Sequence, residues 1–134
     1  SYTIVDKIRD SVDFGNQGGF VRTKANSVFV TPNSTVGSNN IPRASIQTAI
    51  NAASASGDTV YVQAGTYGTV PFPPSGPVDP NAAGANATGK SITLSLGASP
   101  AQVTLNGNLT LDSNDTLLIE ANGTSAQTDY DNFI

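Results

Sequence analysis

The sequence predicts an all-β fold, a short β-solenoid of about three coils with one helix before it. Strand-like segments of three to five residues follow one another closely after residue 90, separated by Gly and Asn. Ile92 and Leu117 lie 25 residues apart, with Val103 and Leu109 between them. This spacing is typical of a solenoid coil with three faces. A small β-sandwich of paired hairpins is the alternative.

The chain begins with a segment that we interpret as an N-terminal arm, residues 1–27. Ile4, Ile8 and Val12 recur every four residues and would form one face of a helix, and several glycines then interrupt the pattern. A short strand is predicted at Val28–Val30, because the apolar run stops before a proline and a polar loop. The solenoid domain is predicted to span residues 28–123.

A short amphipathic helix is predicted over residues 45–54. Its apolar side chains occupy positions i, i+3, i+4 and i+7, which places them on one stripe: Ile46, Ala49, Ile50 and Ala53. Ser45 is the expected N-cap, and Gly57 is expected to end the helix. Asp58 is expected to cap the turn that follows.

A strand follows the helix. Val60, Val62 and Ala64 alternate with Tyr61 and Gln63, which predicts a half-buried strand with the aliphatic side chains inward. The proline-rich residues 71–89 are predicted to form a surface loop. Further strands are predicted within residues 91–96, 101–106, 108–113 and 115–121, followed by a C-terminal tail at 124–134.

The composition excludes several classes of function. Charged residues make up only 12% of the chain and its net charge is −4, so no basic face for nucleic acid is expected. The chain has no His, Cys, Met or Trp, which excludes zinc sites with His or Cys ligands, thiol nucleophiles and histidine acid–base catalysis. No apolar run reaches the ~18 residues of a membrane span.

The stretch IPRASIQTAINAASASGDTVYVQAGTYG (residues 41–68) resembles the N-terminal cap and first coils of right-handed parallel β-helix proteins of the pectin-lyase-like superfamily. In that superfamily a helix of this kind covers the end of the solenoid, and the GDTVYV segment is the first full strand. The resemblance covers about residues 28–123. It implies a right-handed parallel β-helix with an N-terminal capping helix and flexible arms at both ends.

Enzymes of that superfamily use clustered Asp, Arg or Lys residues, often with calcium. Asp112 and Asp115 flank one turn and are weak Ca²⁺ candidates, although the same residues are ordinary turn formers. Lys90 is the one basic residue after Arg43. We therefore predict no catalytic or cofactor-binding residue and no enzymatic activity.

Five Asn-x-Ser/Thr sequons are candidate glycosylation sites: Asn33, Asn86, Asn108, Asn114 and Asn122. They are relevant if the protein is exported through a glycosylating pathway. Tyr61 and Tyr67 could stack on a sugar ring, or could simply pack within the fold.

A solenoid with a covering helix at one end and none at the other predicts self-association, head to tail, through the open end. The expected assembly residues are Ile4, Ile8, Phe133 and Ile134. Our first hypothesis is a non-enzymatic, self-assembling structural subunit of an extracellular filament, an appendage or a virion surface. The alternatives are an adhesin-like module that binds cell-surface glycans, and the N-terminal part of a polysaccharide lyase or hydrolase.

Overall fold

The computed structural model describes residues 24–32, 46–54, 57–67, 84–97, 101–121, 124–125, 128–129 and 131–134. Short strands dominate these residues, with one short helix, so the all-β prediction is confirmed. The elements in chain order are β1 (Ser27–Val30), α2 (Ile46–Ala52), β2 (Thr59–Val62), β3 (Gly65–Tyr67), β4 (Ala85–Asn86), β5 (Thr93–Leu96), β6 (Gln102–Leu105), β7 (Leu109–Thr110), β8 (Thr116–Leu118) and β9 (Asn132–Phe133).

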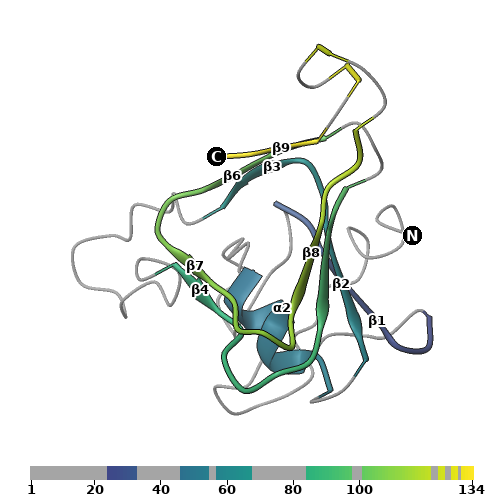
Figure 1. Ribbon diagram of the computed structural model, residues 1–134, viewed down its shortest axis with the longest axis vertical. Coiled ribbons are helices and arrows are strands. Elements are labelled where there is room, and N and C mark those ends of the chain that lie inside the picture. Colours follow the sequence, from purple (N-terminus) through teal and green to yellow (C-terminus); the bar gives the residue numbers. More distant parts are fainter. Residues whose placement is uncertain are drawn as a thin grey trace.

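The strands form three sheets, and every strand pair in them is parallel. The first sheet has the order β1-β2-β5-β8, the second β3-β6-β9 and the third β4-β7. From β2 onward the chain visits the first, second and third sheets in turn, and then repeats that order. Figure 1 shows the sheets as three sides of a triangle, with α2 inside its outline.

The register of the first sheet aligns its apolar side chains in columns. Val28 pairs with Val60, Val60 with Leu94, and Leu94 with Leu117. Leu94 and Leu117 lie 23 residues apart, so the 25-residue spacing of Ile92 and Leu117 is not the coil repeat of this sheet. Side chains two residues apart share a face of a strand, and Ile92 and Leu94 both point inward and are buried.

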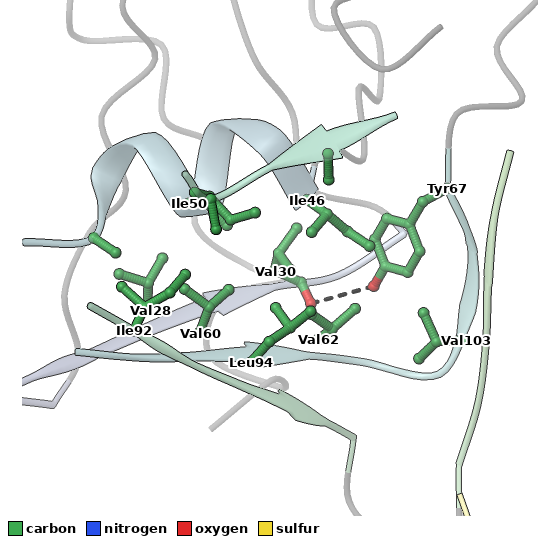
Figure 2. Packing of buried hydrophobic residues seen from close by; sticks show 14 of the residues in the cluster. Val28, Val30, Ile46, Ile50, Val60, Val62, Tyr67, Ile92, Leu94 and Val103 are labelled. Carbon is green, nitrogen blue, oxygen red and sulfur yellow. Dashed lines mark hydrogen bonds between the residues drawn. The ribbon is translucent and has the colours of Figure 1, made fainter. Parts of the chain in front are cut away.

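The core lies inside the triangle, under α2. The helix buries Ile46, Ala49 and Ile50 completely, and Figure 2 shows Ile46 and Ile50 above the valines of β1 and β2. The stripe predicted for this helix is therefore confirmed. The hydroxyl of the fully buried Tyr67 donates to the backbone oxygens of Val30, at 3.3 Å, and Gln63, at 2.7 Å.

Two details of the helix–strand connection differ from the prediction. The helix ends at Ala52, so Gly57 does not end it; Gly57 has a φ of 79° and its N–H donates to the Ser91 backbone oxygen. Ala64 is exposed, because β2 ends at Val62 and the chain turns toward Gly65. Ser45, the predicted N-cap, lies outside the described residues.

The predicted boundaries also change. Within the predicted loop 71–89, Ala85–Asn86 form β4 and pair with β7. Within the predicted C-terminal tail 124–134, Asn132–Phe133 form β9 and pair with β6. Both strands have only two residues, too few for an alternating pattern to appear. Residues 1–23 of the predicted N-terminal arm lie outside the described residues, and Ser27 belongs to β1.

Candidate functional site

The N-terminal end of the sheets is covered by α2. The helix packs against β1, β2 and β4, and thus contacts strands of two sheets. Its inward side chains Ile46, Ala49 and Ile50 have no exposed surface. Its outward side is polar, with Gln47 half-buried and Asn51 exposed. This end therefore presents amide side chains to solvent and no apolar core.

Gln47 also blocks the free edge of β4. The Ala85 and Ala87 N–H groups donate to the backbone oxygens of Asn108 and Thr110, so the Asn86 N–H and C=O point away from β7. The Asn86 N–H donates to Gln47 Oε1 at 2.6 Å, and Gln47 Nε2 donates to the Asn86 backbone oxygen at 3.1 Å. The Gln47 carboxamide thus makes both hydrogen bonds that a neighbouring strand would make. Nε2 also donates to Asn51 Oδ1 at 2.8 Å, which orients the amide.

The C-terminal end has no corresponding cover among the described residues. Leu109, Leu117 and Phe133 occupy the inward positions of β7, β8 and β9, and all three are only half-buried. Their partners in the preceding coil, Ala85, Leu94 and Val103, are buried. We call the surface formed by Leu109, Leu111, Leu117, Ile119 and Phe133 the open end. Ile134 follows the inward Phe133 and continues the outward column of Thr66 and Thr104. Ile119 is 47% exposed and Ile134 is 58% exposed.

The two Ca²⁺ candidates are held by backbone amides. Asp112 accepts from the Gly89 and Asn114 N–H groups, each at 2.8 Å, through different carboxylate oxygens. Asp115 accepts from the Ile92 N–H at 3.2 Å and from the Asp112 N–H at 3.0 Å. The Gly89 hydrogen bond, and then the bond from Asn114, lower the pKa of Asp112 below 3.8. Both carboxylates therefore hold the turn and tie it to the preceding coil, which favours the turn interpretation.

Asp58 and Asp131 close other turns. Asp58 Oδ2 accepts from the Ser54 N–H at 2.7 Å, so it caps the turn after the helix as predicted. Asp131, which the sequence analysis did not single out, is only 3% exposed and accepts from the Ala101 and Glu120 N–H groups, each at 2.9 Å. An Asp in a polar segment gives no sign in the sequence that its partner is a buried amide 30 residues earlier.

The remaining predicted site residues are distributed over separate surfaces. Asn86, Asn108 and Asn114 are exposed, while Asn33 and Asn122 lie outside the described residues. Ile4 and Ile8 also lie outside them. Phe133 belongs to the open end, whereas Ile134 lies on the outer face of the second sheet. Lys90 Nζ donates to the Ala53 backbone oxygen at 2.9 Å.

The two tyrosines discussed as sugar platforms are already in contact with the protein. Tyr67 is buried, and the ring of Tyr61 stacks on Phe29 with centroids 4.9 Å apart and an angle of 13° between the planes. Lys24 Nζ lies 5.9 Å from the centroid of the Tyr61 ring. Phe29 and Tyr61 pair across β1 and β2, so the stack reinforces the outer face of the first sheet.

Charge is unevenly distributed along the chain. Residues 91–134 contain five carboxylates and no Lys or Arg, whereas residues 1–43 contain five of the six basic residues. In the described ranges, no group of three or more Asp or Glu could hold a metal ion. No helix in these ranges is long and apolar enough to cross a membrane.

Comparison of the chain with known protein families, with curated proteins and with solved structures finds no match.

Proposed function

We propose that this chain is a short right-handed parallel β-helix that serves as a non-enzymatic structural subunit and associates with other copies through its open end. The cyclic order of the strands among three parallel sheets supports the β-helix. The right-handed sense follows from the general handedness of connections between parallel strands. The extracellular or virion location belongs to the proposal and rests on the resemblance alone.

The proposal rests on a difference in burial between successive residues that occupy the same inward column of a sheet. Leu94 has no exposed surface, whereas Leu117, the next residue in its column, is only partly buried. Apolar side chains with strand edges beside them are a favourable surface for a further protein segment. Burying the open end would extend the core by one layer.

The carboxylates and Lys90 support a structural function over an enzymatic one. Asp112, Asp115 and Asp131 each accept two backbone N–H bonds, and Lys90 donates to a backbone oxygen. Acid–base catalysis needs such groups within reach of a substrate proton. The adhesin alternative lacks an equivalent observation, because Tyr61 and Tyr67 contact other parts of the protein.

Electron microscopy of negatively stained, natively purified protein at roughly micromolar concentration tests the proposal. Filaments, rings or another regular assembly of small subunits are expected. Particles that stay dispersed as single copies at every concentration would contradict it and would make glycan binding by a monomer the leading hypothesis. A glycan array with the monomer would then be the next measurement.

A further inference from the structure

We infer that two copies pair open end to open end, related by a two-fold axis through the middle of β8, so that the association is a dimer and not a head-to-tail chain. This inference rests on the proposed function, because it names the face of the second copy that the open end contacts. Three observations support it: the covered N-terminal end, the backbone groups that point out of the last coil, and the heights of its three strands.

The N-terminal end of a second copy does not fit the open end. Extension of a sheet across an interface needs a free strand edge on both partners. The Gln47 carboxamide occupies the edge of β4, and α2 buries the apolar side chains beneath it. The surface left at that end is polar, with Asn51 exposed, whereas the open end is apolar. In the described part of the chain, the face that matches an open end is another open end.

The last strand of each sheet points backbone groups toward the open end at the residue whose side chain points inward. The neighbours of these inward residues make the backbone hydrogen bonds to the preceding coil: Asn108 and Thr110 in and beside β7, Thr116 in β8, and Asn132 and Ile134 in and beside β9. Backbone groups alternate in direction along an edge strand, so those of Leu109, Leu117 and Phe133 point toward the open end. Within the described ranges no strand pairs with them on that side. Each of the three strands can therefore accept one further strand.

The heights of the three strands match when a second copy is turned over. Neighbouring strands of a sheet are about 4.8 Å apart, and the chain rises by that amount as it passes through all three sheets, so each strand lies ~1.6 Å above the one before it. The last three strands in chain order are β7, β8 and β9, so β7 lies as far below β8 as β9 lies above it. A two-fold axis through β8 therefore sets β8 against β8, and β7 against β9, each one strand spacing apart. An axis through β7 or β9 would leave unequal gaps, so the open end is complementary to itself about β8.

The register about this axis is consistent on all three sheets. The paired strands run antiparallel, and directly opposite residues whose backbone groups point at each other exchange two hydrogen bonds. Leu117 then pairs with Leu117 of the second copy, and Leu109 with Phe133. Opposite side chains lie on the same face of a sheet, so inward side chains meet inward side chains at each pair. The apolar columns of one copy thus continue into those of the other.

The same register keeps like charges apart. Positions equally far before and after Leu117 face each other, so Glu120 faces Asn114 of the second copy and Asp115 faces Ile119. Asp115 also accepts an N–H of the preceding coil, which directs its carboxylate away from the interface. Like charges that face each other across an interface are unfavourable, and in this register no carboxylate faces another across β8.

Cysteine cross-linking tests the register, because the chain has no native cysteine. Thr116 and Leu118 are exposed, and the axis places each of them opposite the other residue of the second copy. Opposite residues have Cβ atoms about 5 Å apart, near the distance of a disulfide, whereas two Leu118 residues would lie ~8 Å apart on the diagonal. Thr116→Cys and Leu118→Cys proteins are mixed in equal amounts and oxidised. We expect the mixed disulfide to form at least about ten times faster than either homodimer.

Sedimentation velocity of the wild type tests the symmetry without any substitution. A two-fold pair uses both open ends, so association stops at two copies. We expect one associated species with twice the mass of the chain and no larger species as the concentration rises. Asn51→Cys, at an exposed position of α2, is the control that reports head-to-tail contact when it is mixed with Leu118→Cys.

The outcomes separate this inference from the proposed function. Growth beyond two copies, or a dominant disulfide between the Asn51→Cys and Leu118→Cys proteins, would overturn the inference and indicate head-to-tail contact, while the proposed function would stand. A mixed Thr116→Cys and Leu118→Cys product that forms no faster than random collision allows would also overturn it. A wild-type protein that stays monomeric would instead contradict the proposed function.

Discussion

The inward side chains of the three sheets are buried at the N-terminal end and partly exposed at the C-terminal end. At the N-terminal end, α2 covers the columns and buries Ile46, Ala49 and Ile50 completely. At the C-terminal end, Leu117 and Phe133 continue those columns and stay partly exposed. The described part of the chain thus terminates its core with a dedicated helix at one end only.

The comparison extends to the strand edges. On β4, the Gln47 side chain makes the hydrogen bonds of a missing neighbour strand. On the opposite edge of the third sheet, β7 has no equivalent of that amide among the described residues. Unprotected edges with apolar neighbours favour association, and natural proteins block edges that must stay single. Under the proposed function, the C-terminal edges are the ones that would contact a partner.

The largest expected loss of stability comes from shortening a buried side chain of α2, at the N-terminal end of the sheets. Ile50→Ala should reduce the free energy of unfolding by about 2–5 kcal/mol, because the fully buried side chain leaves a cavity between α2 and the sheets. Leu117→Ala, at the open end, should cost only about 1 kcal/mol, because the side chain is only partly buried. Urea unfolding at low concentration measures both. Equal losses would show that the two ends are covered alike.

Loss of the buried Asp131 carboxylate should be the next largest effect. Asp131→Ala leaves the Ala101 and Glu120 N–H groups without their partner, at a cost of about 2–3 kcal/mol. Asp129→Ala is the matched control, since Asp129 also accepts two amides, those of Thr124 and Ser125, but both donors are exposed to water. Thermal unfolding of both variants should show the larger loss for Asp131→Ala. A larger loss for Asp129→Ala than for Asp131→Ala would contradict the role given to the buried Asp131 carboxylate.

Gln47→Glu should open the edge of β4 with a smaller loss of stability. The carboxylate can still accept from the Asn86 N–H but cannot donate to the Asn86 oxygen, which should cost about 1 kcal/mol. Asn51→Ala, which removes only the orienting contact, should cost less. Because β4 gains an open edge, Gln47→Glu should also associate more strongly with rising concentration. Unchanged stability and association in light scattering would show that Gln47 does not protect the edge.

The smallest effect should be the change in the pH dependence of stability when Asp112 is replaced. Its pKa is lowered in the fold, chiefly by the Gly89 N–H and then by Asn114, so its stabilising contribution is complete above pH 3.8. The contribution is lost as the pH falls below that value through the lower pKa of the folded state. Tm measured between about pH 5 and about pH 2.5 should fall less steeply for Asp112→Asn than for the wild type. Parallel curves would contradict this assignment.

Periodic patterns made part of this fold predictable. The apolar stripe of α2 and the alternation of β2 depend only on neighbouring residues, and both are confirmed within the observed bounds. Ala53 and Ala64, the last predicted member of each pattern, lie beyond those bounds. β4 and β9 were missed because a two-residue strand has no period, and proline-rich or polar neighbours conceal it. The polar stretch before Asn132 likewise predicted a tail where the structure has a strand.

The candidate site was less predictable because its contacts join distant positions. Gln47 is a polar helix residue in the sequence, and its role depends on Asn86, 39 residues later. Asp131 depends on Ala101 in the same way. Phe133 and Ile134 stand out in the sequence only as apolar residues at the end of a polar segment. The inward position of Phe133 at the open end follows from β9 pairing with β6, which no local pattern encodes.

Sedimentation equilibrium is the most direct test of the claim that the open end is the association surface. Ile119→Asp places a charge on the open end, and Thr66→Asp places one on the exposed face of β3. The wild type and Thr66→Asp should associate with the same Kd. Ile119→Asp should raise that Kd at least about 100-fold, because an unpaired charge would have to be buried. A wild-type protein that stays monomeric, or an Ile119→Asp variant that associates as tightly as the wild type, would contradict the account.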